Sequence, residues 1–517
     1  WGGSQDDNLD VYVRLVEGSE PVRLTNDPAE DLNPVWSPDG RRLAFYRHTG
    51  TSDGVYLVPA LGGAERKLAD IQGDHFALAP RHWLDWSVQN ELVVSDKSSP
   101  KEPLSLYLLS PETGEKRQVT VPPITTIGDV SPAFSPDGKT LAFVRISRAD
   151  VEDLFVMPLT GGEPKQITFD NAKITDLTWT PDGQEIVFAS RRGGLDTLWR
   201  VAATGGTPEW ISVTGNYAID PTFTRQGNRF AWTQTTTNVD IARLSLTGET
   251  TEAKPFIAST LSDFAAQYSP DGKRIVFISN RSGTYEVWVC NSDGEKAVQL
   301  TSFRGPHTGS PRWSPDSQQI VFDSRPEGNA DLYVIGSEGG KPRRLTTESS
   351  EDIVPSWSLD GKWIYFGSNR TGTMQIWKVP VTGGPAQRVT KLGGFEGVES
   401  ADGKWLYYTK NRGVAEIWRM PVAGGNETLA FNLGQPNYSR LWALTPTGIY
   451  FAVVDSNQRS VLKFYQMATQ NVSTVATAGN PFAPGNSALT LSPDGKWLLF
   501  PQITLQTSDL MTIENFR

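Results

Sequence analysis

Short apolar stretches separated by turn residues recur along the whole chain. The stretch "PVWSPDGRRLAF" (34–45) places apolar residues on both sides of a Ser-Pro-Asp-Gly turn, and close variants begin at Pro132 and Pro311. In such a turn proline presets φ at the first corner, aspartate can bond the local backbone, and glycine takes the left-handed position. Each stretch therefore predicts two short antiparallel strands joined by a tight hairpin.

The hairpin returns at a nearly constant spacing. Its first Ser or Thr occurs eleven times, 42 to 50 residues apart, at Ser37, Ser87, Ser135, Thr180, Thr224, Ser269, Ser314, Ser358, Ser400, Thr445 and Ser492. Repeats of this length are typical of propellers and solenoids. A helical solenoid would show a 3.6-residue period, which is absent, and a β-sandwich would not repeat one signature so regularly.

Each repeat contains two more predicted strands after the hairpin. A third strand has an aromatic centre, as in "VYL" (55–57) and "VWV" (287–289), and a Gly-Gly turn such as 62–63 follows it. A fourth strand, such as "RLT" (344–346), closes the repeat. Four short antiparallel strands per repeat form the blade of a β-propeller. The predicted fold class is therefore all-β, built from four-stranded antiparallel blades.

The number of repeats predicts two rings. The chain begins and ends on third strands (9–16 and 509–515), so the first blade is expected to be incomplete in this chain. One twelve-bladed ring would be unusual, and two tandem six-bladed propellers are predicted instead. The signature weakens at Thr224, and 235–260 is long, polar and weakly patterned. The predicted domains are a first propeller over 1–257 and a second over 258–517.

Composition and charge exclude several classes of protein. The formal net charge of −10 argues against a nucleic-acid partner, which requires a basic surface. No run of about 18 apolar residues is present, so no membrane-spanning segment is expected. The lone cysteine, Cys290, excludes an internal disulfide and a cysteine-based zinc site.

The repeats resemble the TolB-like propellers, whose WD40-like repeat variant carries Pro-Asp in its hairpin. Three further stretches, "LTSFRGPHTGSPRWSPD" (300–316), "FDSRPEGNADLYVI" (322–335) and "SDLMTIENFR" (508–517), are similar to the C-terminal half of CadC-like regulators. In those regulators a winged-helix domain and one transmembrane helix precede tandem propellers. The resemblance implies an extracytoplasmic sensor or interaction module, periplasmic or extracellular, although a cytoplasmic location is not excluded.

The sequence predicts no catalytic, cofactor or metal site. One G-x-S-x-G stretch, Gly50 to Gly54, falls in a blade loop, whereas a nucleophile elbow lies between a strand and a helix. The histidines (48, 75, 82 and 307) are far apart in sequence and are typical of loops. Two alternative functions stay open: an accessory propeller of a prolyl-oligopeptidase-like or tricorn-like peptidase, and a secreted self-assembling structural protein.

Topology places a candidate ligand site at one face. Crossings between blades and variable loops such as 501–508 reach the face opposite the hairpin turns, where recognition usually resides. The candidate binding residues at this channel mouth are Glu30, Asp31, Asp129, Asp176, Asp220, Asp263, His307, Asp352 and Glu396, with Arg47, Arg281, Arg325 and Arg370. They would bind a protein, a peptide or a small polar ligand. Alternatively, the acids bind backbone N–H groups or the arginines and hold the blades in place.

Overall fold

The computed structural model describes most of the chain and is almost entirely β-strand. The described residues are 2–5, 8–15, 18, 20–49, 53–72, 81–148, 151–169, 172–192, 196–215, 217–225, 229–247, 252–304, 307–326, 329–348, 350–411, 414–434, 440–455, 459–483 and 488–516. Their regular structure consists of strands and one 3-10 turn, η2 (Ser212–Thr214). Within these ranges, no helix has the length and apolar character needed to cross a membrane. The G-x-S-x-G stretch lies largely outside the described residues.

The chain forms two compact units. Unit 1 comprises Trp1–Thr235 and Ser508–Arg517, and unit 2 comprises Thr236–Thr507. These units differ from the predicted ranges 1–257 and 258–517. The difference arises because 236–257 belongs with unit 2 and the last ten residues belong with unit 1. The division into two six-bladed propellers stays a prediction.

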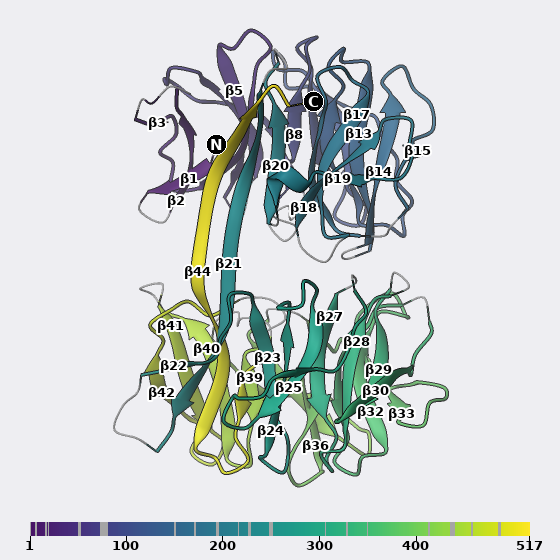
Figure 1. The fold of residues 1–517 in the computed structure, drawn as a ribbon, viewed down its shortest axis with the longest axis vertical. Coiled ribbons are helices and arrows are strands. Elements are labelled where there is room, and N and C mark those ends of the chain that lie inside the picture. The colour runs from purple at the N-terminus through teal and green to yellow at the C-terminus, as the bar shows by residue number, and fades with distance from the viewer. Residues whose placement is uncertain are drawn as a thin grey trace. The chain divides into compact units, whose positions relative to one another are not determined.

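The sheets of unit 1 follow the chain in order (Figure 1), and the described strands within each sheet pair antiparallel. Their strands are β1 (Gly2–Gln5), β2 (Asn8–Val13) and β3 (Val22–Arg23); β4 (Glu30–Trp36), β5 (Arg42–His48), β6 (Gly54–Pro59) and β7 (Arg66–Asp70); β8 (Leu84–Trp86), β9 (Leu92–Asp96), β10 (Ser105–Leu109) and β11 (Lys116–Gln118); β12 (Gly128–Phe134), β13 (Thr140–Arg148), β14 (Val151–Pro158) and β15 (Lys165–Gln166); β16 (Ile174–Trp179), β17 (Glu185–Ser190), β18 (Thr197–Ala202) and β19 (Glu209–Trp210).

Unit 2 repeats this arrangement. Its strands are β23 (Asp263–Tyr268), β24 (Arg274–Ser279), β25 (Glu286–Asn291) and β26 (Val298–Gln299); β27 (Thr308–Trp313), β28 (Gln319–Ser324), β29 (Asp331–Gly336) and β30 (Gly339–Arg344); β31 (Asp352–Trp357), β32 (Trp363–Ser368), β33 (Gln375–Pro380) and β34 (Gln387–Arg388); β35 (Gly397–Glu399), β36 (Trp405–Thr409), β37 (Glu416–Pro421) and β38 (Thr428–Asn432); β39 (Trp442–Leu444), β40 (Gly448–Val454), β41 (Ser460–Gln466) and β42 (Asn471–Thr477). The prediction of an all-β fold of four-stranded antiparallel sheets is confirmed.

One further sheet is built from segments that are distant in sequence. It runs β20 (Ala218–Phe223), β21 (Arg229–Ser245), β44 (Trp497–Glu514) and β43 (Thr490–Leu491), and β22 (Lys254–Ile257) pairs with β21. The boundary between the units divides both β21 and β44. The prediction of a loop at 501–508 was therefore wrong, because these residues continue β44.

The Ser-Pro-Asp-Gly hairpin has the predicted turn chemistry. In the turn between β4 and β5, the Ser37 hydroxyl donates to Asp39 at 2.6 Å, and the Arg41 N–H donates to the same oxygen at 3.0 Å. Gly40 has a φ of 69° and donates its N–H to the Ser37 carbonyl at 3.0 Å. The bond from the Ser37 hydroxyl, followed by that from the Arg41 N–H, lowers the pKa of Asp39. The repeated sequence thus specifies the turn that sets the register of each hairpin.

The core lies between successive sheets and is built on one recurring position. The residue eight places after the hairpin Ser or Thr is a fully buried aromatic residue in many repeats: Phe45, Phe143, Phe188, Phe277, Phe322, Phe366, Tyr408 and Phe500. Around Phe366, for example, side chains of β28, β29, β32 and β33 form one apolar cluster. Alternating strand positions therefore fill the space between sheets.

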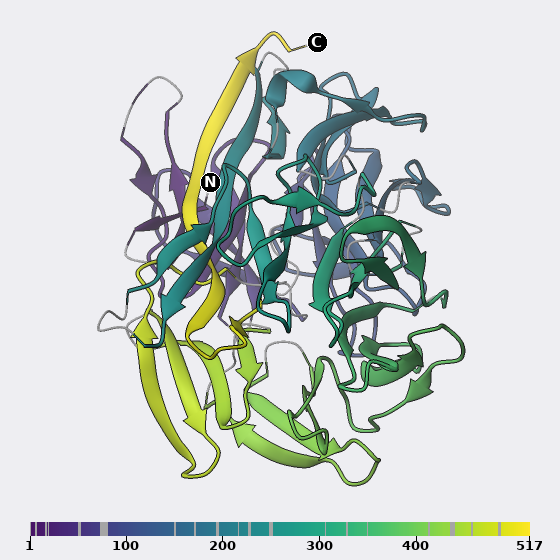
Figure 2. The ribbon, with the colours of Figure 1, turned by 60° about the horizontal axis from the view of Figure 1, so that its bottom comes forward.

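The first strand of each sheet is the innermost. In unit 1, β4, β8, β12, β16 and β20 contact one another in succession. In unit 2, β23, β27, β31 and β35 do so, and β43 contacts both β39 and β23. Figure 2 shows the sheets of unit 2 following one another around a common centre. Many first strands carry a bulge at a residue with positive φ: Asn33, Ser131, Asp220, Ala265, Ser310 and Val354.

Candidate functional site

Half of the predicted acids are bound within their own sheets. These four lie on first strands, have no exposed surface, and accept bonds from an arginine near the end of the second strand or just after it. The N–O distances are 2.6 Å for Asp31–Arg47, 2.7 Å for Asp129–Arg145, 2.7 Å for Asp263–Arg281 and 2.7 Å for Asp352–Arg370. For these pairs the observed contacts match the structural interpretation, in which the arginines hold the acids.

Each of these arginines also stacks on an aromatic ring of the third strand. The guanidinium carbon lies 4.6 Å from the ring centre for Arg47 over Tyr56, 4.7 Å for Arg145 over Phe155 and 4.8 Å for Arg370 over Trp377. Burial raises the pKa of Asp31, Asp129 and Asp263, and the hydrogen bonds from arginine oppose that shift. The aromatic centre of the third strand therefore supports a buried ion pair in addition to packing.

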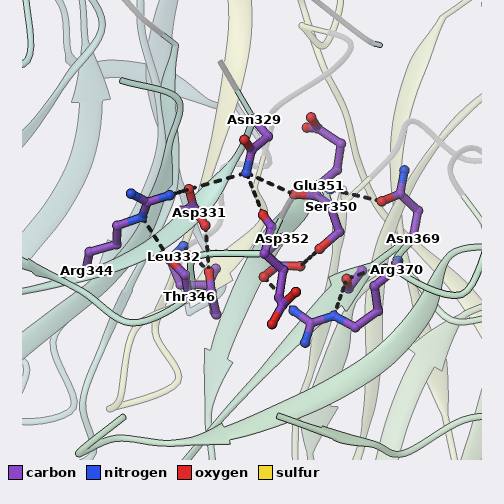
Figure 3. Close-up of polar contacts among 12 residues, drawn as sticks. Asn329, Asp331, Leu332, Arg344, Thr346, Ser350, Glu351, Asp352, Asn369 and Arg370 are labelled. Carbon is purple, nitrogen blue, oxygen red and sulfur yellow. Dashed lines mark hydrogen bonds and ion pairs between the residues drawn. The ribbon is translucent and has the colours of Figure 1, made fainter. Parts of the chain in front are cut away.

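A second buried acid begins the third strand and was missed by sequence reasoning (Figure 3). Asp331 accepts from Arg344 at 2.6 Å and from the Thr346 hydroxyl at 3.2 Å, and that hydroxyl accepts the Leu332 N–H at 3.0 Å. The same bonds join Asp10 to Arg23 and Thr25. The signal was present in the fourth-strand "RLT" at 344–346, which had been used only to mark a strand.

The ionisation of Asp331 should make unit 2 less stable as the pH rises. Burial raises the pKa of Asp331 to about 6, despite the bonds from Arg344 and Thr346. The unfolded carboxyl ionises near its ordinary value of about 4, so its ionisation subtracts stability progressively between about pH 4 and pH 6. We expect up to about 2–3 kcal/mol of loss over that window, which an Asp331→Asn variant will not show. Urea unfolding of both proteins at pH 4 and pH 7 measures the difference; parallel curves would contradict the prediction.

One further predicted residue of unit 2, Glu396, belongs to a cluster that joins three sheets. Glu396, which precedes β35, lies 3.3 Å from Nη2 of Arg312 on β27 and 3.6 Å from Nε of Arg440, which precedes β39. Trp442 donates its indole N–H to Glu396 at 3.1 Å, and Arg440 donates to the Ser310 hydroxyl at 2.9 Å. Two guanidinium groups therefore share one carboxylate.

The two guanidinium groups lie in a buried place, where the charges of Glu396 and Asp323 both act on Arg312. The Arg440 side chain is 1% exposed, and its Nε and Nη2 have no hydrogen-bond partner among the described residues. Burial, followed by the charge of Arg440, lowers the pKa of Arg312 to about 10. Neither arginine was predicted as a site residue, since "PRW" (311–313) was assigned only to a strand. We call Arg312, Glu396 and Arg440 the arginine cluster.

Three other predicted residues have individual positions. Arg325 lies 3.2 Å from Glu351 and 3.8 Å from Asp323, so it also belongs to an ion-pair network of unit 2. The His307 ring packs edge-on against Tyr285, with ring centres 5.7 Å apart. Glu30 begins β4, and its Oε2 is buried without a hydrogen-bond partner in the described part of the chain.

In unit 1, Asp176 and Asp220 come together with a histidine. One ligand atom each from His82, Asp176 and Asp220 lies within 4.8 Å of the other two, and Nδ1 of His82 is 3.1 Å from Oδ2 of Asp176. Burial raises the pKa of Asp176 to about 7, and the neighbouring carboxylates of Asp220 and Asp85 add to the shift. His82 was expected to be a loop residue, and nothing in its sequence spacing linked it to the two acids.

Comparison with protein families decides the affiliation of the chain. The family model described as "TolB beta propeller domain" matches residues 85–295 and 264–397, which together span more than half of the chain. The chain belongs to the TolB beta propeller domain family. The predicted resemblance to TolB-like propellers is thus confirmed, whereas the finer resemblance to CadC-like regulators stays a prediction.

Curated relatives of this TolB propeller chain match parts of it. A TolB homolog of Chlorobium luteolum is 29% identical over 157 residues, covering 30% of this chain and 33% of that protein. The uncharacterized protein Atu1656 of Agrobacterium fabrum is 30% identical over 217 residues, covering 41% and 67%. The uncharacterized peptidase YuxL of Bacillus subtilis is 28% identical over 192 residues, covering 36% and 25%. The chain thus spans about a third of the TolB homolog.

A solved structure also resembles the chain. TolB from Acinetobacter baumannii is 17% identical, with a TM-score of 0.37, and the match covers 65% of this chain and 81% of that one.

Proposed function

We propose that the chain is a non-catalytic interaction module that binds an acidic segment of a protein partner through the innermost strands of unit 2. The observation that supports this most directly is the arginine cluster, in which two buried guanidinium groups share Glu396. Nε and Nη2 of Arg440 have no hydrogen-bond partner among the described residues, and such unoccupied cationic donors favour an additional anionic group. A carboxylate is the matching group in a protein partner, because the planar guanidinium binds it with paired hydrogen bonds.

The solvent exposure of Arg312 and the nearby charge of Arg440 also favour Arg312 as the residue that contacts the ligand carboxylate. Its side chain retains 14% exposure, whereas that of Arg440 retains 1%. Arg440 therefore acts on an incoming carboxylate through its charge, which is felt strongly in a poorly solvated place. Arg312 supplies the hydrogen-bond donors. Its own contact with Glu396 is long, at 3.3 Å, and a ligand carboxylate can compete for it.

We further propose that the module comprises two six-bladed propellers and forms the extracytoplasmic part of a signalling or transcriptional regulator. The sheet order in each unit supports the two rings. The similarity of 300–316, 322–335 and 508–517 to CadC-like regulators supports the sensor role and a periplasmic or extracellular location. In this proposal the ligand of unit 2 is the signal or the partner that carries it.

Removing the charge of Arg312 should weaken the binding of acidic peptides. Fluorescence anisotropy with labelled Asp/Glu-rich decapeptides should give saturable binding that an Arg312→Gln substitution weakens at least tenfold, which is the effect of losing a charge-assisted bond. Arg343→Gln is the matched control, because Arg343 is an exposed arginine on β30, away from the innermost strands. Equal binding of Asn/Gln-substituted peptides, or equal weakening by both variants, would contradict the proposal.

A second candidate function rests on the peptidase relative. Its match to this chain favours a role as the accessory propeller of a hydrolase, for which the arginine cluster would hold acidic peptide substrates. Mass spectrometry of the same decapeptides after incubation tests whether the chain itself is catalytic. Intact peptides are expected from a binding module and from an accessory propeller alike, and cleavage products would overturn the non-catalytic proposal.

A further inference from the structure

Three metal-ligating side chains of unit 1 converge from three different sheets. His82 precedes β8, Asp176 lies on β16 and Asp220 lies on β20, and all three elements belong to the innermost strands. Their ligand atoms lie within 4.8 Å of one another, although 138 residues separate the first from the last. Asp220 is held in the left-handed region, with a φ of 51°, at the bulge of its strand. The fold therefore brings one imidazole and two carboxylates to one point.

The bonding of Asp176 indicates that a ligand belongs there. Asp176 is 1% exposed, and neither of its carboxylate oxygens has a hydrogen-bond partner among the described residues, although His82 lies close by. A buried carboxylate without donors is costly, since burial removes its hydration and nothing replaces it. The neighbouring Asp85 differs, because it accepts the N–H groups of Trp86 and Phe134, each at 2.8 Å. Asp176 has only a marginal backbone contact of this kind, from Leu177, and burial outweighs its effect on the carboxylate.

A second histidine–aspartate pair in unit 1 shows what a satisfied pair looks like. His48 lies 3.0 Å from Asp53. That aspartate also accepts the Tyr46 hydroxyl at 2.6 Å and the Thr49 N–H at 3.0 Å. These bonds, together with that from His48, bring the pKa of Asp53 below its ordinary value. The His48–Asp53 pair thus needs no further cation, and it provides an internal control for the His82–Asp176 pair.

Charge and donor type both favour a divalent cation. Three carboxylates, those of Asp85, Asp176 and Asp220, influence the single imidazole of His82. One imidazole nitrogen with two carboxylate oxygens is a ligand set used for Zn²⁺ and related first-row ions, whereas Mg²⁺ and Ca²⁺ take oxygen ligands. Ligands about 2.0–2.2 Å from such an ion lie about 3.3–3.6 Å from one another in a tetrahedron. The His82–Asp176 distance of 3.1 Å is within a few tenths of an ångström of that range.

We propose that His82, Asp176 and Asp220 bind a Zn²⁺-class divalent cation at the innermost strands of unit 1. The three protein ligands leave a coordination position for water or for a ligand atom of a partner. The ion supplies the positive charge that the buried carboxylates lack. It also links the sheets that carry β8, β16 and β20. This site is independent of the arginine cluster, which lies in unit 2.

Metal titration of the full chain tests the site. Protein freed of metal with EDTA and dialysed should take up one Zn²⁺ per chain by competition with a fluorescent chelator, and the uptake should raise its Tm. Substitutions His82→Gln and Asp176→Asn should each weaken the Zn²⁺ affinity at least tenfold and abolish the Tm rise, because each removes one of the three protein ligands. His48→Gln should leave both unchanged. Circular dichroism and the metal-free Tm show whether each variant is folded.

Specific outcomes would overturn the proposal. Zn²⁺ uptake that is the same in wild type, His82→Gln and Asp176→Asn would place the ion elsewhere. No uptake, with a Tm that is insensitive to Zn²⁺, would mean that His82 and Asp176 form only a proton-sharing pair. Stronger binding of Ca²⁺ than of Zn²⁺, unaffected by His82→Gln, would remove the imidazole from the ligand set. If either variant is unfolded, Asp220→Asn provides the same comparison.

Discussion

Replacing Arg145 with methionine is expected to lower the free energy of unfolding of unit 1 by about 3–5 kcal/mol. The substitution removes the partner of Asp129, a carboxylate with no exposed surface, which Arg145 binds at 2.7 and 2.9 Å. An unpaired carboxylate avoids the free-energy cost of burying its negative charge only by taking up a proton. The loss should therefore be largest at high pH and shrink as the pH falls, because burial already raises the pKa of Asp129.

The measurement is urea unfolding followed by tryptophan fluorescence, fitted with separate transitions for the two units. The double variant Arg145→Met, Asp129→Leu is the informative control, because it removes the buried charge together with its partner. It should recover a large part of the stability. If the single and double variants are equally unstable, the effect comes from lost packing against Phe143 and Phe155 and not from an unpaired charge.

Truncating one buried aromatic residue should destabilise unit 2 by a similar amount. Phe322→Ala is expected to cost about 3–5 kcal/mol, since the substitution leaves a cavity in a close-packed core. Phe322 has no exposed surface, and its ring centre lies 5.8 Å from that of Tyr333 and 6.1 Å from that of Phe303. The same residue type recurs eight positions after the hairpin in other repeats, so the result should hold for Phe277 and Phe366.

A matched surface substitution separates core packing from a general effect of alanine. Leu392, in the same unit, is 70% exposed, and Leu392→Ala should change the stability by less than about 0.5 kcal/mol. Urea unfolding of the three proteins under identical conditions gives the comparison. If Phe322→Ala lowers the free energy of unfolding by less than about 1 kcal/mol, the neighbouring sheets have moved together and filled the cavity.

Local turn chemistry and strand alternation made most of the fold predictable. Each Ser-Pro-Asp-Gly segment specifies its own hairpin through bonds within five residues, as Ser37, Asp39 and Gly40 show. The long strands β21 and β44 were not predictable in the same way. Their polar stretches, such as 235–240, carry no alternation because no core lies on one face throughout, and the pairing of β21 with β44 joins residues more than 250 positions apart.

The candidate site was only partly predictable for a related reason. The acids at the first strands were found because each follows a crossing, but their partners depend on three-dimensional proximity. Arg47 lies within one hairpin of Asp31, and the sequence suggested such pairing. Arg440 reaches Ser310 across 130 residues, and His82 reaches Asp176 across 94, so no local pattern could reveal either contact.

The division of β44 has a consequence for how the chain is made. Its end, from Ser508 onward, belongs to unit 1, where Glu514 pairs with Arg229 and Phe516 packs 4.6 Å from Phe230. During translation residues 1–235 leave the ribosome before residues 508–516, yet the sheet that contains β20 includes β44 from the later segment. Unit 1 must therefore persist with an unpaired sheet edge, exposed to chaperones and proteases, until residues 508–516 have been synthesised.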